Sequence, residues 1–496
     1  MPPPPATPPD GAEPLPRAQV RTACAVVGCL GLTVVVAVAA LVYIVLTVLG
    51  DLTPQPTGTE KEKPKKASAR PDPVGPTALK TDRAVFPLPA TFDAVGPAAN
   101  GRFLLLRVPF KSEVAVFDPV EAKITRTFPL GAPNALFAGG AGKLHVFRPK
   151  AKEFEQFDLL TGERDETAKK PDAMAAVDHL LAGAGVDEPL LVLSAGQPKS
   201  DVAVGSPPPA AWKYFGVTEW AIPDASFHAR ASADGRTIGL VSRADDRAAK
   251  ILRFAPPGSF AASPVGKAGH PGHLTPSPDG RAVYSARGVF DRDGKYVLRP
   301  DGDTFYTFPA AHGSDLYLSI GVDHRGKFEP PLRLHLAGSR IPVATIDRVS
   351  LPTGLDARDS SDVPMDQRIH LWPAAGLLAV LPTSNAAIDM YKVDVGALLK
   401  ASGKDHLVFA TAPPTTATRG EKLVYEPKVW SAPDGPVSFE VVGPAGAAMR
   451  GPVLLWSVPE STPEREVGVT LRAKHPDGRT AEQSFRVLLV EPAPKS

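Results

Sequence analysis

The sequence is poor in cysteine and asparagine. It has 496 residues but only two cysteines, Cys24 and Cys29, and both lie in one apolar run near the N-terminus. The rest of the chain therefore has no thiol for a disulfide, a Cys-ligated metal or a cysteine nucleophile, and a large body without thiols suits an oxidising compartment. Its three asparagines, Asn100, Asn134 and Asn385, do not stand in an Asn-x-Ser/Thr sequon. The sequence thus offers no N-glycosylation site.

An excess of charge of either sign is also absent. The chain has 55 basic and 53 acidic residues, which give a formal net charge of +2. A nucleic-acid-binding protein usually shows a basic face or stripe, and no such concentration of Lys and Arg is present. The composition therefore argues against a nucleic-acid partner and leaves membrane, protein and glycan partners.

One apolar run stands out against this balanced composition. Residues 23–49 contain no Asp, Glu, Lys or Arg. As a helix the run would be about 40 Å long, enough to span a bilayer core of about 30 Å with some tilt. It is too long for the apolar core of a cleaved signal peptide, and its apolar residues fill every helix face, unlike those of a buried core helix. We therefore expect one transmembrane helix.

The segments on either side of this run are rich in proline. Residues 1–22 form a low-complexity tail, for which a disordered leader is favoured over a ligand for a proline-binding module. Residues 51–78 form a Pro- and Lys-rich linker that is expected to stay extended. Because Arg17 and Arg21 precede the run and lysines follow it, the positive-inside rule does not decide the orientation. The thiol-free body favours an extracytoplasmic location, and the lysine-rich linker supports the cytoplasmic alternative.

From residue 79 to 405 the chain consists of short apolar or alternating runs separated by turn residues, the pattern of many β-strands. Two turns repeat almost unchanged: SADGR at 232–236 precedes TIGLVS, and SPDGR at 277–281, 45 residues later, precedes AVYSA. Asp-Gly suits a tight hairpin turn. A period of about 40–50 residues with several strands per repeat is typical of propeller blades, which bury their faces against one another in a ring.

This turn-and-strand pattern resembles the WD40-like and YVTN-type bacterial β-propeller repeats, although no unit carries a Gly-His with a terminal Trp-Asp pair. The resemblance implies a propeller of about seven blades over residues 79–405. Residues 79–88 are expected to supply an outer strand that closes the last blade. The expected units lie at about 92–130, 133–170, 174–220, 227–267, 272–310, 314–349 and 360–402.

Residues 410–492 have strands spaced by about ten residues, which is the pattern of a β-sandwich. This segment resembles cadherin-like, Ig-like bacterial modules. Isolated acids such as Asp434 and Asp477 do not form the clustered set that calcium requires, so no calcium site is expected. The residues that carry the resemblance are Gly443, Pro444, Ala445 and Gly446 with Met449 nearby, Leu455 and Trp456, Asp477 and Gly478, and Phe485, Arg486 and Val487.

The best candidates for metal ligands are His270 and His273, three positions apart, with His228 in the preceding unit. The pair lies in a Gly/Pro segment with no acidic or Cys partner at ligand spacing. A solvated loop between blades is therefore favoured, and we expect no metal and no cofactor. The other histidines considered are expected to be ordinary surface or loop residues: His312, His324 and His370.

Signals for nucleophilic or acid–base catalysis are weak. No Gly-x-Ser-x-Gly elbow occurs, and the Ser-Gly-Lys at 402–404 lacks the upstream glycine of a phosphate loop. Paired acids stand in turn-rich sequence, where Asp stabilises turns through its own side chain. We therefore assign no catalytic, cofactor-binding or metal-ligating residue. The acid pairs considered are Asp245 with Asp246, Asp291 with Asp293, and Asp301 with Asp303.

Taken together, the sequence predicts an all-β body, a β-propeller followed by a small β-sandwich, behind one transmembrane α-helix. Rigid surfaces with loops at their ends, and no catalytic signature, favour a binding or scaffolding protein at the cell envelope with a protein or glycan ligand. The alternatives are a hydrolase or lyase with its site in the central channel, and a cytoplasm-facing docking or sensor platform. Titratable side chains converging in the channel would favour catalysis, and a small or apolar lining would favour binding. The ligand and the oligomeric state stay open.

Overall fold

The structure is a computed structural model. The predicted tail (1–22), membrane helix (23–49) and linker (51–78) lie outside the described residues. Within the part of the chain that is described, no helix is long and apolar enough to cross a membrane. The described residues are 79–172, 174, 176–187, 190–194, 200–205, 213–217, 227–242, 249–255, 259–265, 271–298, 304–310, 315–323, 327–352, 363–462, 464 and 466–492.

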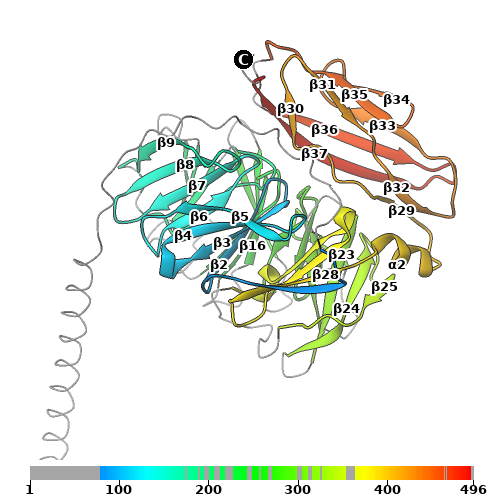
Figure 1. The fold of residues 1–496 in the computed structure, drawn as a ribbon, viewed down its shortest axis with the longest axis horizontal. Helices are drawn as coiled ribbons and strands as arrows, with labels where there is room; N and C mark the ends of the chain where they lie inside the picture. The colour runs from blue at the N-terminus through cyan, green and yellow to red at the C-terminus, as the bar shows by residue number, and fades with distance from the viewer. Residues whose placement is uncertain are drawn as a thin grey trace, which may run out of the picture. The chain divides into compact units, whose positions relative to one another are not determined.

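Seven four-stranded antiparallel sheets, here called blades 1 to 7, follow one another between residues 83 and 392 (Figure 1). Blade 1 is β2 (Ala94–Ala98), β3 (Phe103–Val108), β4 (Glu113–Asp118) and β5 (Lys123–Pro129). Blade 2 is β6 (Leu136–Gly139), β7 (Lys143–Arg148), β8 (Glu153–Asp158) and β9 (Arg164–Lys169). Blade 3 is β10 (His179–Leu181), β11 (Leu190–Ser194), β12 (Ser200–Gly205) and β13 (Lys213–Val217). Blade 4 is β14 (Phe227–Ala231), β15 (Thr237–Ser242), β16 (Ala249–Ala255) and β17 (Ser259–Pro264).

The remaining three blades repeat this order, with one exception in the last. Blade 5 is β18 (Thr275–Pro276), β19 (Ala282–Ser285), β20 (Gly288–Asp291) and β21 (Tyr296–Leu298). Blade 6 is β22 (Thr304–Pro309), β23 (Leu316–Val322), β24 (Phe328–Leu336) and β25 (Ala344–Ile346). Blade 7 is β26 (Ile369–Trp372), β27 (Leu377–Val380), β28 (Ala387–Lys392) and, as its fourth strand, β1 (Arg83–Pro87).

The middle strands of the blades are buried on both faces, because each blade lies between two others. The strand FLLLRV (β3) is buried at five of its six positions, and TIGLVS (β15) at all six, whereas the outer strand β5 alternates between exposed and half-buried residues over most of its length. The middle strands can therefore be recognised in the sequence as continuous apolar runs. The hydrophobic clusters combine residues of consecutive blades, including blades 7 and 1. The seven sheets thus form a closed β-propeller.

The N-terminal strand closes the ring, as expected for residues 79–88. β1 pairs antiparallel with β28 along the outer edge of blade 7. On the other side of this blade, Trp372 Nε1 donates to the carbonyl of Gly101 at 2.7 Å, and Gln367 Nε2 donates to that of Val95 at 2.7 Å. Blade 7 is therefore built from both ends of the propeller sequence and is bonded to blade 1, which closes the ring at this point.

One blade boundary differs from the expectation. The fifth unit was expected to run to residue 310, but β22 is the first strand of blade 6. The strands of blade 5 are only two to four residues long, so this blade ends at Leu298. Because blade 5 is short, blade 6 begins earlier than the average spacing of the repeats predicts.

The short helix α2 (Val395–Ala401) leads from blade 7 to a second body. The core of this second body includes Trp456, Leu471 and Val487. Trp456 Nε1 donates a hydrogen bond to the carbonyl of Ala445 at 3.2 Å. One sheet is β30 (Thr416–Thr418), β37 (Thr480–Val490), β36 (Glu466–Lys474) and β33 (Ser438–Val442), and the other is β31 (Lys422–Tyr425), β35 (Val453–Ser457) and β34 (Ala448–Arg450). A separate ladder joins β29 (His406–Phe409) to β32 (Val429–Ala432). The alternating burial of β36 and β37 is that of sheets packed face to face around one core.

Candidate functional site

The first strands of all seven blades surround a cavity of about 520 Å³, here called the central cavity. Most of its wall is apolar or small, with Phe137, Leu181 and Ile369 among the larger side chains. Several of its residues are only half-buried, so solvent reaches it. Polar side chains also line it: Asp93, Arg107, Asp178, His179, His228, Arg230, Thr275, Asp366, Gln367 and His370.

An ion pair between Arg230 and Asp366 joins two sides of the central cavity. Arg230 lies on β14, and Asp366 lies in the short 3-10 turn η4 (Met365–Gln367) that precedes β26. Arg230 Nε donates to Asp366 Oδ2 at 2.8 Å, and Thr275 Oγ1 donates to the same oxygen at 3.1 Å. Burial by itself would raise the pKa of Asp366, but the charge of Arg230, aided by His273 and His228, holds it below its ordinary value. Asp366 is therefore ionised at neutral pH.

Arg107 and Asp93 repeat this arrangement in blade 1. Arg107 Nε donates to Asp93 Oδ1 at 2.6 Å and Nη2 donates to Oδ2 at 3.1 Å, while Nη1 donates to the carbonyl of Ala135 at 3.0 Å. In the same way, Nη1 of Arg230 donates to the carbonyl of Ala229 at 3.0 Å. Both guanidinium groups thus engage one carboxylate and one backbone carbonyl. The two arginines hold the cavity wall together.

Two imidazoles of the cavity, those of His179 and His370, are neutral at neutral pH. Burial, aided by the charge of Arg230, lowers the pKa of His179 to about 4. Burial lowers the pKa of His370 to about 4 as well, although the hydrogen bond to the Gln367 carbonyl and the charge of Asp366 both act to raise it. His370 Nε2 donates to that carbonyl at 2.8 Å. The ring of His179 packs at 4.1 Å from that of Phe227 and makes no hydrogen bond to a residue that the structure describes.

At one end of the central cavity, the turns between the first and second strands of several blades are joined by backbone hydrogen bonds. We call these turns, at 99–101, 183–186, 233–235 and 278–280, the floor turns. Asn100 N donates to Ala184 O at 2.6 Å, which links blades 1 and 3 across the ring. The chain of bonds continues from Gly185 N to Ala233 O at 2.8 Å and from Ala233 N to Pro278 O at 3.0 Å. The floor turns therefore narrow this end of the channel.

Glycine is required in the floor because the turns come so close together. A Cβ atom on Gly183 would lie 2.4 Å from the backbone nitrogen of Gly235, and one on Gly185 would lie 2.2 Å from Asn100 Oδ1. Both distances are far below van der Waals contact. The glycines of the LAGAG segment at 181–185 are thus needed because neighbouring blades pack against this turn, and not only because the turn is flexible.

The repeated DGR turns have the expected structural role. Asp234 Oδ1 accepts from the backbone nitrogen of Arg236 at 3.0 Å, and Asp279 Oδ1 accepts from that of Arg281 at 3.1 Å. Asp291 similarly accepts from two backbone nitrogens of its own turn. These aspartates stabilise hairpin turns, as predicted. The other acids considered, Asp245, Asp246, Asp301 and Asp303, lie outside the described residues.

Two predictions for histidines were wrong. His273 does not lie in a solvated loop: it is 2% exposed, stacks on Tyr306 at 4.1 Å, and its Nε2 donates to the carbonyl of Thr307. His370 is a channel residue on β26 and not a surface or loop residue. His228 lines the cavity near Asp366. Within the described ranges, no group of three or more His, Cys, Asp or Glu could hold a metal ion. His270, His312 and His324 lie outside those ranges.

Two other arrangements of reactive residue types are structural. Gly403 has a φ of +63° and follows α2, so the Ser-Gly-Lys segment ends a helix and does not cradle a phosphate. A hydrogen bond of 2.8 Å joins Ser319 to His335, a pair that the sequence did not suggest. These two residues are 1% and 4% exposed, so they are out of reach of a substrate.

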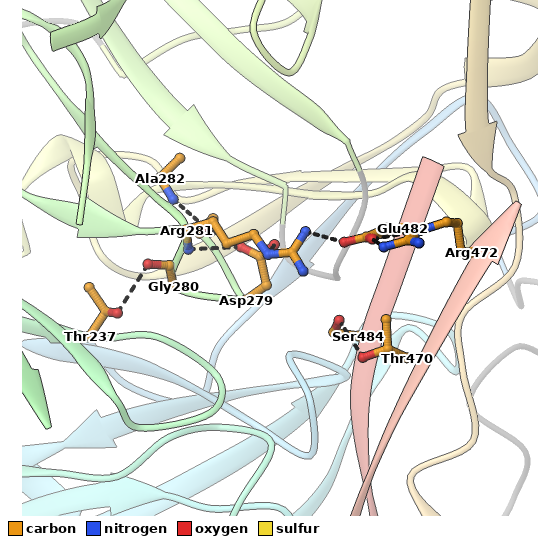
Figure 2. A network of polar contacts seen from close by, with 10 residues as sticks. Thr237, Asp279, Gly280, Arg281, Ala282, Thr470, Arg472, Glu482 and Ser484 are labelled. Atoms are coloured by element: carbon orange, nitrogen blue, oxygen red, sulfur yellow. Dashed lines mark hydrogen bonds and ion pairs between the residues drawn. The ribbon is translucent and has the colours of Figure 1, made fainter. Parts of the chain in front are cut away.

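A second cavity, of about 460 Å³, lies between the floor turns and the sandwich. Beside it, Arg281 extends from its DGR turn to Glu482 on β37, with an Nη1–Oε2 distance of 2.5 Å, and Arg472 Nε approaches the same carboxylate at 2.9 Å (Figure 2). Burial raises the pKa of the neighbouring Asp315 to about 7; Asp279 and Glu482 add to this effect, and Arg281 opposes it. Three carboxylates, those of Asp279, Asp315 and Glu482, thus lie near Arg281, and Arg472 shares the contact with Glu482.

Sequence reasoning missed the polar residues that matter most in the central cavity, namely Arg230, Asp366 and His179. A weak signal was present, since three histidines and Arg230 fall in the first, channel-facing strands of their units. The partner of Arg230 stands 136 positions away, so no local pattern joins the two residues.

No family model matches the chain, and no curated protein matches it. Among solved structures, the chain is similar to the β-propeller domain of Cps50 (Swd1) from Myceliophteria thermophila, with 13% identity and a TM-score of 0.41 over 63% of this chain and 99% of that chain. It is also similar to Hsv2 from Kluyveromyces lactis, with 12% identity and a TM-score of 0.37 over 59% and 89% of the two chains. A third similar structure is the dihydro-heme d1 dehydrogenase NirN in complex with DHE, at 13% identity and a TM-score of 0.37 over 69% and 84%. These scores are low, so the propeller assignment rests on the seven sheets, and no function is carried over.

Proposed function

We propose that this chain is a binding protein whose ligand is held in the central cavity of the propeller. The observation that carries this proposal is the chemistry of the wall. It is mainly apolar, its two arginines are engaged with Asp366 and Asp93, and a few polar groups stand among the apolar ones. A mostly apolar pocket with a small number of placed polar groups is the usual form of a small-molecule site.

The rival function is a hydrolase or lyase with its site in this cavity. Titratable side chains do converge there, which is the arrangement that such an enzyme needs. However, a general acid or base works best when its pKa lies near the working pH. The pKa values of His179 and His370 are lowered to about 4, and that of Asp366 lies below its ordinary value. These three groups are therefore poorly matched to proton transfer at neutral pH, and binding is the better supported function.

We also propose that the body is tethered and displayed at the cell envelope. The support is in the sequence: residues 23–49 would form one membrane helix, and residues 51–78 would act as the linker. On this proposal the C-terminal sandwich, of the cadherin-like or Ig-like kind, offers a second surface for a protein or glycan ligand. The body would instead be a docking or sensor platform if it faces the cytoplasm.

Protease treatment of cells, followed by detection of the C-terminus, tests the tethering proposal. Cleavage once only the outer layers are opened is expected for an envelope protein. Cleavage that needs an opened cytoplasmic membrane would place the body inside and overturn the envelope assignment.

Fragment binding tests the cavity proposal. We would record saturation-transfer NMR spectra of the full chain with benzamide, benzoate and benzamidine, which have the same flat ring and different charges. At least one fragment is expected to bind to the wild type. Binding is expected to be lost in A94W, which fills the cavity at half-buried Ala94, and kept in A401W, which adds the same side chain at the exposed end of α2. Binding that survives A94W would place the ligand elsewhere.

A further inference from the structure

We propose that the central cavity selects an uncharged ligand and holds it through a hydrogen bond to the ring of His179. This inference rests on the proposed binding function and adds the class of ligand and the residue that recognises it. Two independent features of the cavity carry it: the pairing of its charges and the position of His179.

Two ion pairs compensate the charges of both arginines in the wall. The Arg230 guanidinium is occupied by both oxygens of Asp366, at 2.8 and 3.4 Å, and by the carbonyl of Ala229. Arg107 is occupied in the same way by Asp93 and the carbonyl of Ala135. The carboxylates of Asp366 and Asp93 are thus each neutralised by a guanidinium, which uses three of its five N–H groups on protein acceptors.

A charged ligand would therefore meet an unfavourable environment. Moving an ion from water into a mostly apolar cavity carries a large desolvation penalty unless a counter-charge is present. An anion would meet guanidinium groups whose charge Asp366 and Asp93 already compensate, and a cation would meet carboxylates whose charge the two arginines already compensate. A ligand that competes for either pair must also weaken it, and the Arg230–Asp366 pair is the more deeply buried, with 18% and 1% of the two side chains exposed.

His179 supplies the hydrogen bond that an uncharged ligand can use. It lies on β10, lines the cavity, and is half-buried. As a neutral imidazole, its ring has one donor and one acceptor. Neither nitrogen is bonded to a residue of the described part of the chain, whereas Nε2 of His370 is already engaged by Gln367. The ring is held in place by its contact with Phe227 at 4.1 Å.

The shape of the ligand follows from the neighbours of His179. Phe137, Phe227 and Leu181 line the same cavity and offer apolar faces. A flat or apolar body with one uncharged polar group, such as an amide or a hydroxyl, would place that group on the imidazole and its body against these side chains. Asp178 also lines the cavity and is a third carboxylate beside Asp93 and Asp366, so the cationic probe is the stricter test.

The experiment compares benzamide, benzoate and benzamidine on the full chain and adds variants of His179. We expect benzamide to bind at least about tenfold more tightly than either charged analogue. H179F keeps an aromatic ring beside Phe227 but removes the hydrogen bond, and we expect it to weaken benzamide binding about three- to tenfold. H179Q, which has an amide donor and acceptor, is expected to restore most of the affinity. Circular dichroism confirms that each variant is folded.

Each contrary result overturns a different statement. If benzoate or benzamidine binds as tightly as benzamide, the preference for an uncharged ligand is overturned, while the cavity remains a binding site. If H179F and the wild type bind benzamide equally, the role of His179 is overturned. If none of the three probes binds to the wild type, the proposed function falls together with this inference.

Discussion

Arg83 Nη2 lies 2.9 Å from Asp389 Oδ2, across 306 positions of the sequence. The two residues belong to neighbouring strands of blade 7, β1 and β28, so this ion pair spans the point at which the propeller closes. The same guanidinium lies over the ring of Tyr391, at 5.4 Å from its centroid. Beneath the pair, Ile388 is fully buried in the core shared by blades 7 and 1.

The ion pair is expected to contribute less to ring closure than the apolar packing does. R83A should lower the free energy of unfolding by less than about 1 kcal/mol, because 49% of the Arg83 side chain is exposed and water screens such pairs. I388A should lower it by about 2–5 kcal/mol, because it leaves a cavity in the core. Thermal denaturation followed by circular dichroism compares the two. A larger loss for R83A would show that the ion pair holds the ring shut.

Breaking the cavity pair on one side should be severely destabilising. D366A leaves the charge of Arg230 buried without its partner, and we expect a loss of about 3–5 kcal/mol. The double variant R230M/D366A removes both charges and should lose less than the sum of D366A and R230M, as a double-mutant cycle measured by chemical denaturation would show. Because the folded-state pKa of Asp366 is lowered, its stabilising effect is lost only in acid and is constant between pH 5 and 8. Strictly additive effects would contradict the pairing.

The stability of the chain should carry a pH dependence from Asp315. Its folded-state pKa is raised to about 7, whereas an unfolded Asp titrates near about 3.9. Between these values the folded chain keeps a proton that the unfolded chain has lost, so this group makes stability fall as pH rises from about 4 to about 7. D315N should flatten the curve of melting temperature against pH and raise the melting temperature at pH 8. D82N, at an exposed position, is the matched control; parallel curves for D315N and wild type would refute the assignment.

The floor turns should tolerate no side chain at Gly183. G183A places a Cβ atom against the backbone of Gly235, and backbone cannot move aside as a flexible side chain can. We expect a loss of about 1–3 kcal/mol or more, as for overpacked cores. G468A is the control, because a Cβ atom there would meet nothing within 4 Å. Equal melting temperatures for the two variants would mean that the floor turns are less tightly packed than described.

The strands and tight turns could be predicted because each depends on local sequence. TIGLVS and AVYSA each follow an Asp-Gly turn, and they form β15 and β19 at the expected residues. The closing strand at 83–87 was also foreseeable, since a ring of sheets requires a partner for β28. The end of blade 5 could not be predicted, because its strands are too short to show an alternating pattern.

The central cavity could not be predicted in the same way, because it is assembled from residues far apart in the chain. Arg230 and Asp366 pair across 136 positions, and each looks ordinary in its own segment. His273 stands in a Gly/Pro segment that suggests solvent, yet a neighbouring blade covers it and stacks Tyr306 on its ring. The glycines of the LAGAG segment suggest flexibility until the turn that packs against them is known.

The place of β1 in blade 7 has a mechanical consequence. A pull on the chain from the N-terminal side of Leu79 acts first on the buried side chain of Leu79 and on the hydrogen bond from Lys392 N to Asp82 O. It then acts on the short ladder that runs from Arg83–Tyr391 to Pro87–Ala387. The force would load this one outer strand before any other strand of the ring, because β1 is the first strand along the described chain. We therefore expect the force at which the propeller opens to depend on this ladder and on the buried side chain of Leu79, more than on the cores shared by the other blades.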